Sequence, residues 1–451
     1  MRQITPVNKL AKSLSWLAAL IIVLLPFHAF LTVWLSSLVG HYTLLRLWKE
    51  FLLVPITIGA LYILFGDKSL RRKFFSLWLV RLTLIYALLL VVNAAAARAA
   101  HTVTAKAMWY GLLVDLRFLV FFLAVLALAA SSNWLGQNWQ KILLGPAILV
   151  GAFAVLQYLV LPTDFLSHFG YGSSTISPYE TINHNIQHIR VASTLRGANP
   201  LGAYLILPIS VLSVMYFRQK RQRLNIILFG AGLVLALIFS FSRSAWIGAA
   251  LAVIAAAWLS LKSNKLKRTA LWAAVGLVIL AAAAALSLRN NHTFQDVFLH
   301  TDSASKIAQS SNQGHSAAFK AAAKDIVHQP LGRGVGTAGP QSVYNDKPAR
   351  IAENYFLQIG QEAGILGMLL FIAITVLVGK MLYERRADPL ALALFASLIG
   401  ISFVNLLSHA WSDDTLAYIW WGLAAIALSP VIIADRHNQK KWPKNQKPAV
   451  R

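Results

Sequence analysis

Residues 108–130 read MWYGLLVDLRFLVFFLAVLALAA, an apolar run interrupted by only two charged side chains, Asp115 and Arg117. A helix of this length can cross the ~30 Å hydrocarbon core of a bilayer. Similar apolar runs lie near 14–37, 51–65, 74–94, 142–162, 200–217, 224–241, 245–261, 269–288, 355–379, 388–408 and 415–434. The sequence therefore predicts an all-α protein, a polytopic transmembrane helical bundle of about 12 spans.

The composition agrees with a membrane protein. The chain is 57% hydrophobic and 13% charged, whereas soluble proteins carry roughly 25% charged residues. Its formal net charge of +25 could indicate nucleic acid binding. However, membrane proteins concentrate Lys and Arg in cytoplasmic loops that face anionic lipid, and no soluble basic domain is present to hold a nucleic acid. We expect the lipid bilayer as a partner and no nucleic acid.

The distribution of basic residues predicts the orientation of the bundle. With the N-terminus inside, the inside segments hold 25 Lys and Arg, and the short outside connections hold 7. This bias predicts a multi-pass protein of the cytoplasmic (inner) membrane with both termini cytoplasmic. The predicted parts are spans 1–9 with an outer loop at 163–199 (residues 1–288), an extracytoplasmic loop subdomain (289–352), spans 10–12 (353–434) and a basic cytoplasmic tail (435–451).

The large outer loop between spans 9 and 10 contains two recognisable segments. Residues 315–329 have small apolar side chains at helical spacing and predict an amphipathic helix. The following PLGRGVGTAGP is typical of a turn-rich loop. It is a weak candidate for a phosphate-binding loop because no strand precedes it.

Arginines at the predicted outer edge of the membrane are candidates for binding an anion. Arg243, in FSFSRSAW (239–246), interrupts two apolar runs with almost no loop, and Arg190 and Arg196 are the only basic residues of the loop 163–199. A guanidinium stays charged and offers a planar fork of donors that suits phosphate. The alternative for Arg243 is a side chain that reaches the lipid headgroups without binding substrate.

Carboxylates at the same edge are candidates for proton transfer and for sugar binding. Glu353, followed by Asn354, lies at the outer mouth of a span, where a carboxylate could act as a general base. It could equally be a helix N-terminal residue favoured by the helix dipole. Asp413 and Asp414 occupy the outer turn between the last two spans, where they could orient a sugar hydroxyl or form a solvated turn.

The remaining polar residues support neither a metal site nor a cofactor site. His184 and His188 have the i, i+4 spacing found in zinc sites, but no third ligand is apparent and the chain has no cysteine. We therefore predict no metal and no cofactor. Asp115 and Arg117 point in different directions on a helix, and we expect them to be neutralised structurally.

Taken together, these motifs resemble the family of O-antigen ligases and polysaccharide polymerases, which are membrane glycosyltransferases. Ser242-Arg243-Ser244-Ala245 is similar to the family's Ser-Arg motif at the outer end of a span. The stretch from Arg190 to Asn199-Pro200 is similar to its Arg…Asn-Pro segment. Glu353-Asn354, then nine residues, then Gly364-x-x-Gly367 is similar to the ligase pattern that begins with His-Asn. The resemblance covers most of residues 105–430.

The resemblance implies a metal-independent, inverting transferase of the membrane-embedded (GT-C-like) type. Its donor would be a polyprenyl-diphosphate-linked glycan, and its acceptor a glycan or glycolipid on the outer face of the cytoplasmic membrane. Arg243, Arg190 and Arg196 would bind the donor diphosphate, and Glu353 with Arg243 would be catalytic. Asn354, Asp413, Asp414 and His315 would position the acceptor or the sugar.

The sequence departs from the family pattern at two positions. Ligases of this group carry a histidine where this chain has Glu353, and His315 stands where many members have an arginine. A glutamate can still accept a proton, so the departure favours a polymerase of cell-envelope polysaccharide slightly over a ligase. One alternative is a multi-span transporter or lipid flippase, but the two halves of the sequence do not match as internal repeats would, and the notable charges cluster at one face. The other alternative is a scaffold for envelope assembly.

Overall fold

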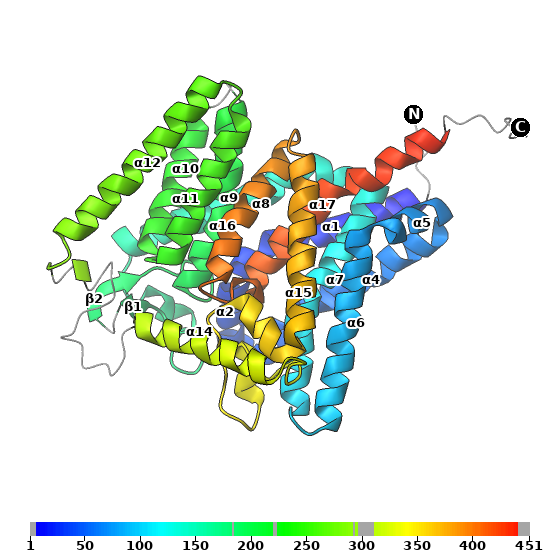
Figure 1. The fold of residues 1–451 in the computed structure, drawn as a ribbon, viewed down its shortest axis with the longest axis horizontal. Helices are drawn as coiled ribbons and strands as arrows, with labels where there is room; N and C mark the ends of the chain where they lie inside the picture. Colours follow the sequence, from blue (N-terminus) through cyan, green and yellow to red (C-terminus); the bar gives the residue numbers. More distant parts are fainter. Residues whose placement is uncertain (1–5, 183–184, 220–222, 292–293, 296–310, 441–451) are drawn as a thin grey trace, which may run out of the picture.

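Each apolar run of the sequence forms a helix. The computed structural model describes residues 6–182, 185–219, 223–291, 294–295 and 311–440 (Figure 1). The helices and strands are α1 (Pro6–Leu24), α2 (His28–Val39), α3 (Tyr42–Arg46), α4 (Trp48–Gly66), α5 (Lys68–Ser76), α6 (Trp78–Ala99), α7 (Ala105–Ser131), α8 (Trp134–Leu159), β1 (Glu180–Ile182), β2 (Asn185–Arg190), α9 (Ala198–Arg218), α10 (Arg223–Phe239), α11 (Arg243–Ser260), α12 (Asn264–Ser287), α14 (Ser311–His328), α15 (Tyr355–Glu384), α16 (Pro389–Asn405) and α17 (Asp414–Lys440).

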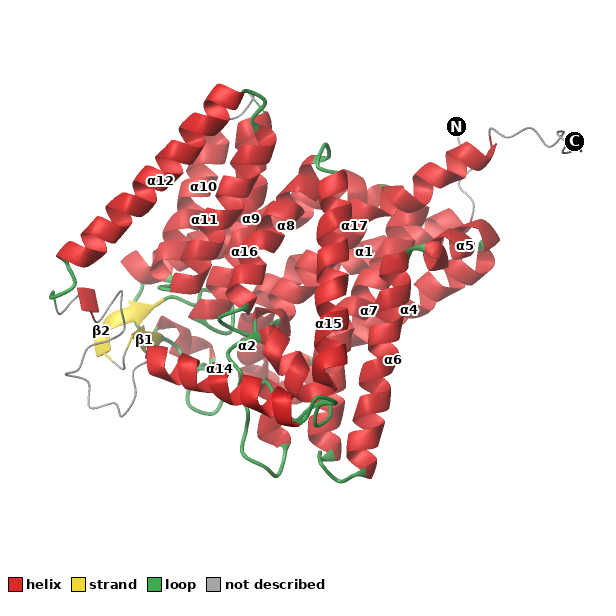
Figure 2. Ribbon diagram, viewed as in Figure 1, coloured by secondary structure: helices red, strands yellow, loops and turns green. Residues whose placement is uncertain are grey.

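The all-α prediction is confirmed, with one local exception. Within the described residues, nine helical segments are long and apolar enough to cross a membrane, and α10 and α16 are shorter apolar helices. The exception is a small antiparallel hairpin of β1 and β2 in the loop 163–199, the only strands in the described part of the chain (Figure 2). The boundaries predicted for the parts of the chain remain predictions. Residues 441–451 of the predicted basic tail lie outside the described residues.

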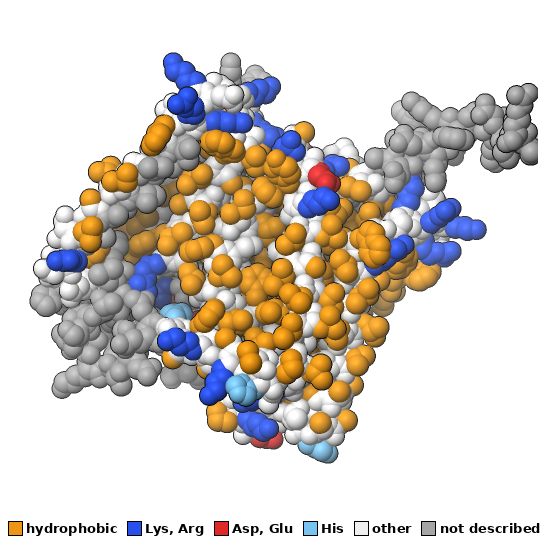
Figure 3. All heavy atoms as spheres, viewed as in Figure 1, with side chains coloured by type: hydrophobic (Ala, Val, Ile, Leu, Met, Phe, Trp, Pro, Cys, Tyr) orange, Lys and Arg blue, Asp and Glu red, His pale blue; other side chains and the backbone are white. Residues whose placement is uncertain are grey.

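The bundle has two ends of different character. We call the end that carries the hairpin, α14 and the connection 329–354 the loop face, and the opposite end the tail face. The predicted amphipathic helix is confirmed as α14, which lies across the loop face with Ala322 and Ile326 buried (Figure 1). Between the two ends the surface is largely hydrophobic, with Lys and Arg gathered toward the ends (Figure 3). This distribution is that of a protein embedded in a bilayer.

Short basic connections meet on the tail face. The guanidinium of Arg218, at the end of α9, donates to the backbone carbonyls of Arg386 (2.6 Å) and Ala387 (2.8 Å) in the connection between α15 and α16. Two connections that were predicted to lie inside are thus in contact at one end of the bundle. The contact supports the prediction that these two connections lie on the same side of the membrane.

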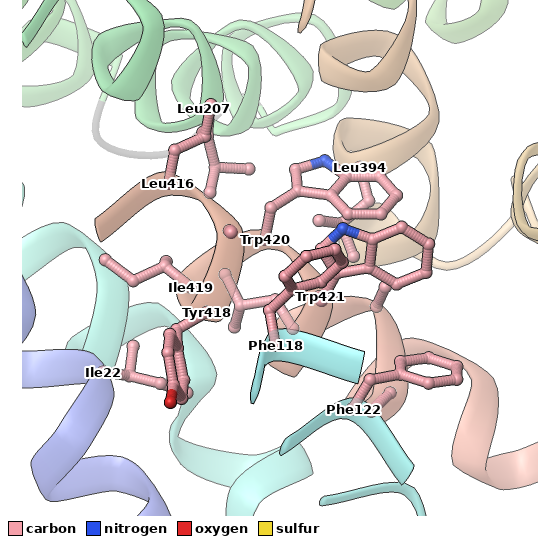
Figure 4. Packing of buried hydrophobic residues seen from close by; sticks show 14 of the residues in the cluster. Ile22, Phe118, Phe122, Leu207, Leu394, Leu416, Tyr418, Ile419, Trp420 and Trp421 are labelled. Atoms are coloured by element: carbon pink, nitrogen blue, oxygen red, sulfur yellow. The ribbon is translucent and has the colours of Figure 1, made fainter. Parts of the chain in front are cut away.

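Aromatic side chains fill the centre of the bundle. Trp420 and Trp421 of α17 are fully buried, and Trp421 packs against Phe118 and Phe122 of α7 at ring-centroid distances of 5.6 and 5.5 Å (Figure 4). The indole nitrogen of Trp420 donates to the hydroxyl of Ser397 at 3.0 Å. Because lipid provides little hydrophobic force between helices, such close packing and interhelical hydrogen bonds stabilise a membrane bundle.

Two glycines bring α11 and α16 into backbone contact. A Cβ atom on Gly400 would lie 2.1 Å from the carbonyl oxygen of Gly248, and a Cβ on Gly248 would lie 2.8 Å from that of Gly400. No larger residue fits at either position without moving a helix. The contact holds α11 in place against α16 and thereby fixes its first residue, Arg243, at the loop face.

A buried ion cluster links α4, α7 and α17. Its members are Lys49, Glu50, Arg117 and Asp414: Lys49 Nζ lies 2.9 Å from Asp414 and 3.1 Å from Glu50, and Arg117 pairs with Asp414 and, at 3.1 Å, with Glu50. Lys49 and Arg117 are 1% and 6% exposed. The expected structural neutralisation of Arg117 is confirmed. Two cations and two anions balance one another.

We expect Asp414→Asn to destabilise the protein strongly, by about 3–5 kcal/mol, because it leaves a buried cation without a counter-charge. Asp413→Asn is the matched control. The Asp413 side chain is 7% exposed, but that of its partner Arg196 is 41% exposed and becomes solvated when the pair is lost. An asparagine at position 413 can still accept from the backbone N–H groups of Thr415 and Leu416, so we expect a smaller loss than for Asp414→Asn. The measurement is the thermal unfolding midpoint of both variants in the same detergent. Equal shifts for the two variants would contradict this account of the ion cluster.

Candidate functional site

A cavity of about 650 Å³ opens at the loop face, at the ends of several helices. Its walls come from four distant parts of the chain: the segment before and at the start of α9, the turn from α10 into α11, the helix α14 with residue 353, and the connection after α16. We call it the transfer cavity. It is lined by Arg190, Asn199, Phe241, Arg243, Ser244, Ile247, His315, Ser316, Phe319, Lys320, Glu353, Leu406, Leu407 and Ser408.

Arg190 is held rigidly at the wall of the transfer cavity. Its Nε donates to the carbonyl of Ser240 (3.1 Å), one terminal nitrogen donates to Oδ1 of Asn199 (2.6 Å), and the other lies 3.6 Å from Glu180. These contacts join the hairpin, α9 and the end of α10. The Arg…Asn-Pro stretch singled out in the sequence therefore forms a local cross-link, with 14% of the arginine side chain left exposed.

Arg243 enters the same cavity from the first position of α11. The turn before it, residues 240–242, is short, and Phe241 there has a positive φ of 48°. The N-terminus of an 18-residue helix adds partial positive charge to that of the guanidinium. Arg190 is close enough for the two cations to repel each other. The cavity wall therefore favours an anion such as a diphosphate.

Glu353 faces the transfer cavity from a position just before α15. Its Oε2 lies 3.6 Å from Nδ1 of His315 on α14, and its side chain is 33% exposed. Burial raises the pKa of Glu353, while the neighbouring His315 partly opposes that rise. Its backbone is in the left-handed region, at a φ of 51°. Such strain costs about 1–3 kcal/mol and tends to occur at functional sites.

Asn354, by contrast, has a structural position. Its side chain caps α15 by accepting from the backbone N–H of Leu357 (3.0 Å), and its amide nitrogen donates to the carbonyl of Leu406 (3.0 Å). With its amide oxygen and nitrogen both engaged and 3% of the residue exposed, Asn354 orients Glu353 instead of lining the cavity. Gly364 ends this first stretch of α15 with a positive φ of 72°, which kinks the helix.

Three further candidates lie outside the cavity lining. Arg196 pairs through Nε with Asp413 at 3.0 Å. Burial raises the pKa of Asp413, while Arg196 opposes that rise. Asp414 belongs to the buried ion cluster. The two adjacent aspartates that were predicted to form one sugar-binding turn therefore have separate partners, because successive residues at a helix start point in different directions.

The structure offers no metal-binding cluster among the residues it describes. His184, one of the two histidines considered for zinc, lies outside those residues, and His188 lies on β2. Within the described ranges, no three His, Cys, Asp or Glu side chains converge. Glu180, which accompanies Arg190, bonds instead to the backbone N–H of Ala198 at 3.1 Å.

Sequence reasoning missed His409, beside the cavity wall at Ser408. Burial, together with the positive charges of Arg196 and His315, lowers the pKa of His409 to about 4. Its Nδ1 is buried without a hydrogen-bond partner. A neutral histidine at this position can accept or donate one hydrogen bond to a bound hydroxyl. The sequence signal that could have identified His409 was its position directly after a predicted span, at the end that forms the loop face.

The second missed feature is Glu362, the buried acidic side chain that the glycine-rich loop surrounds. The buried carboxylate of Glu362 accepts from the backbone N–H groups of Gly336 (2.8 Å) and Ala338 (3.3 Å) and from Nε2 of Gln341 (2.9 Å). Asp115 lies against Glu362 from α7. The glycine-rich loop, a weak phosphate-binding candidate in the sequence, thus directs its backbone N–H groups at an acidic side chain of the same protein.

These features define a polytopic helical membrane protein with an arginine- and carboxylate-lined cavity at one end of its bundle. Residues 227–372, which include Arg243 and Glu353, match the sequence model of a protein family described as O-antigen ligase. The match supports the resemblance drawn from the motifs for this part of the chain. No curated protein matches the chain.

Proposed function

We propose that the protein transfers a glycan from a polyprenyl-diphosphate-linked donor to an acceptor hydroxyl on the outer face of the cytoplasmic membrane, in cell-envelope polysaccharide synthesis. The observation that carries the proposal is the transfer cavity, which gathers Arg190, Arg243 and Glu353 from distant segments. A diphosphate leaving group needs fixed positive charge where its anion forms. The two arginines and the α11 N-terminus supply that charge without a metal ion.

The proposed step is a direct, inverting displacement. Glu353 takes the proton of the acceptor hydroxyl, and the acceptor oxygen forms a bond to the anomeric carbon of the donor sugar. The bond between that carbon and the diphosphate oxygen breaks, and polyprenyl diphosphate leaves with the electron pair. Arg243 and Arg190 bind the departing anion, and His315 positions Glu353 through their contact. Arg196, which pairs with Asp413, would act on the donor only at longer range.

The place of the cavity favours transfer over transport. A transporter needs a site near the middle of the membrane that is reached from each side in turn. The lining residues lie at helix ends instead: Asn199 at the start of α9, Arg243 at the start of α11 and Leu406 after α16. The experiment that tests the proposal is transfer by the purified protein from a defined polyprenyl-diphosphate-linked glycan. In a deletion strain, loss of long surface glycan chains would indicate the polymerase that we favour, and chains stranded on the lipid carrier would indicate a ligase.

His315→Gln is expected to shift the acid limb of the pH profile of kcat/KM to higher pH. Glu353 must be deprotonated to act as a base, and its burial raises its pKa above the ordinary 4.5. His315 stabilises the carboxylate of Glu353 and opposes the rise of its pKa, so removal of the imidazole raises the pKa of Glu353 further. His328→Gln, an exposed position on α14 outside the cavity, is the control. An unchanged limb, or one displaced to lower pH, would refute this role of His315.

A further inference from the structure

A second cavity, of about 480 Å³, lies on the loop face beyond the other end of α14. We call it the distal cavity. Its walls are the loop-face end of α6, the turn from α6 to α7 and the glycine-rich loop after α14. Its lining includes Asn93, Thr102, Gln329, Arg333, Lys347 and Arg350.

The distal cavity is cationic. Three basic side chains line it and no acidic one does. Asp325 lies behind two of them, 3.3 Å from Arg333 and 3.4 Å from Arg350, and also accepts from Gln361 at 2.8 Å. One carboxylate thus holds two guanidinium groups in fixed positions and neutralises only part of their charge. Lys347 adds a further positive charge.

The walls of the distal cavity are held rigid before any ligand binds. Asn93 of α6 donates to the carbonyl of Leu331 (3.3 Å) and accepts from the N–H of Val335 (3.1 Å). Thr102 donates to the carbonyl of Arg333 at 3.1 Å. These bonds fasten the glycine-rich loop to the α6–α7 turn. A preformed cationic cavity loses little entropy on binding an anion.

The position of the distal cavity indicates where its ligand comes from. On α6, Leu88, Val91 and Val92 are exposed apolar residues one or two turns below the cavity, as expected for a helix face in contact with lipid. The cavity therefore lies at the loop-face border of the apolar surface of α6.

One helix joins the distal cavity to the transfer cavity. Ser316 of α14 lines the transfer cavity, and Gln329, directly after its last residue, lines the distal one. Thirteen residues at 1.5 Å each separate them by about 20 Å. An extended glycolipid can occupy both cavities at once, although a single diphosphate cannot.

We propose that the distal cavity binds an anionic group, phosphate or carboxylate, of the acceptor glycolipid while its reacting hydroxyl lies in the transfer cavity. This inference rests on the proposed transfer and specifies its acceptor as an anionic one. The same chemistry would suit the headgroup of an anionic phospholipid of the bilayer. The experiment has separate arms for binding and for transfer.

The binding arm uses glucose 6-phosphate as probe and glucose as its uncharged counterpart. Saturation-transfer NMR is recorded with the protein in phosphatidylcholine nanodiscs. Lys347→Gln should weaken glucose 6-phosphate binding about 5- to 10-fold, which corresponds to one charge-assisted hydrogen bond. Lys347→Arg should restore it, and Lys324→Gln, an exposed position on α14 outside both cavities, should leave it unchanged. The same titrations are repeated with the Arg243→Gln variant, so that probe bound in the transfer cavity does not contribute to the measured affinity.

Two results of the binding arm would overturn the proposal. One is equal affinity of Lys347→Gln and the wild type for the probe. The other is loss of the wild-type signal when phosphatidylglycerol replaces phosphatidylcholine, because it would assign the cavity to a bilayer phospholipid.

The transfer arm measures KM and kcat with lipid-linked donor and the glycolipid fraction of the source cells. Lys347→Gln should raise the KM for the acceptor about 5-fold, with kcat and the KM for the donor changed less than about 2-fold. A change in donor KM alone would contradict the proposal. If the wild-type protein bound the probe through Lys347 but showed no transfer activity, the anion-binding site would stand and the proposed function would be refuted instead.

Discussion

Arg243→Ala is expected to lower the rate of glycan transfer by about 10²–10³-fold, the effect of removing one preorganised donor from an anion that forms in the transition state. Arg243 contributes a guanidinium fork at the N-terminus of α11, next to Arg190. Arg243→Lys should retain part of the activity, because an ammonium keeps the charge but not the planar pair of donors.

The control for Arg243 is Arg223→Ala, an arginine at the opposite end of the adjacent helix α10. Transfer is measured with purified protein and lipid-linked donor, and folding is checked by thermal unfolding. A stable Arg243→Ala protein that transfers glycan within 3-fold of wild type would show that the arginine takes no part in the reaction, since one lost donor lowers the rate about 10²–10³-fold.

Glu353→Gln is expected to lower transfer by about 10²–10⁴-fold, because an amide of the same shape cannot accept the acceptor's proton. Glu353→His should be more active than Glu353→Gln, since imidazole is a base and ligases of this family carry histidine at this position. Histidine also tolerates the left-handed backbone that residue 353 adopts.

Glu384→Gln is the matched control for Glu353→Gln. Glu384 is an exposed glutamate at the other end of the same helix, and its replacement should leave the rate of transfer unchanged. The loss should fall on kcat more than on the KM for the donor, because a general base acts in the transition state. If both Glu353→Gln and Arg243→Ala transferred glycan normally, the proposed reaction would be wrong, whatever the distal cavity binds.

The helices were predictable because each depends on a local property of the chain. Apolar runs separated by short basic connections specify α4, α6 and α7 without knowledge of their neighbours. The small residues of α14 likewise specified its buried side. The hairpin of β1 and β2 was not predicted, because its strands are short and polar and lack an alternating apolar pattern. In the described part of the chain, each strand forms its ladder of backbone hydrogen bonds only with the other.

The site was only partly predictable, because the partner of a charged side chain is a tertiary property. The motifs correctly singled out Arg190, Arg243 and Glu353 as residues at one end of the bundle, and all three line one cavity. The separate partners of Asp413 and Asp414 could not be read from their adjacency, since Arg196 and Arg117 are hundreds of positions away. Glu362 lies inside an apolar run, and nothing in the sequence indicated that the glycine-rich loop would donate hydrogen bonds to it.

The scattered origin of the transfer cavity has a consequence for biogenesis. Arg190 and Arg243 enter the membrane early in synthesis, but Glu353 follows more than a hundred residues later, and Leu406 closes the wall only after α16 is made. A nascent chain that already holds both arginines would have no base with which to activate an acceptor. The proposed enzyme therefore acquires its activity late, when its last helices have joined the bundle, and incomplete chains could not consume the lipid-linked donor.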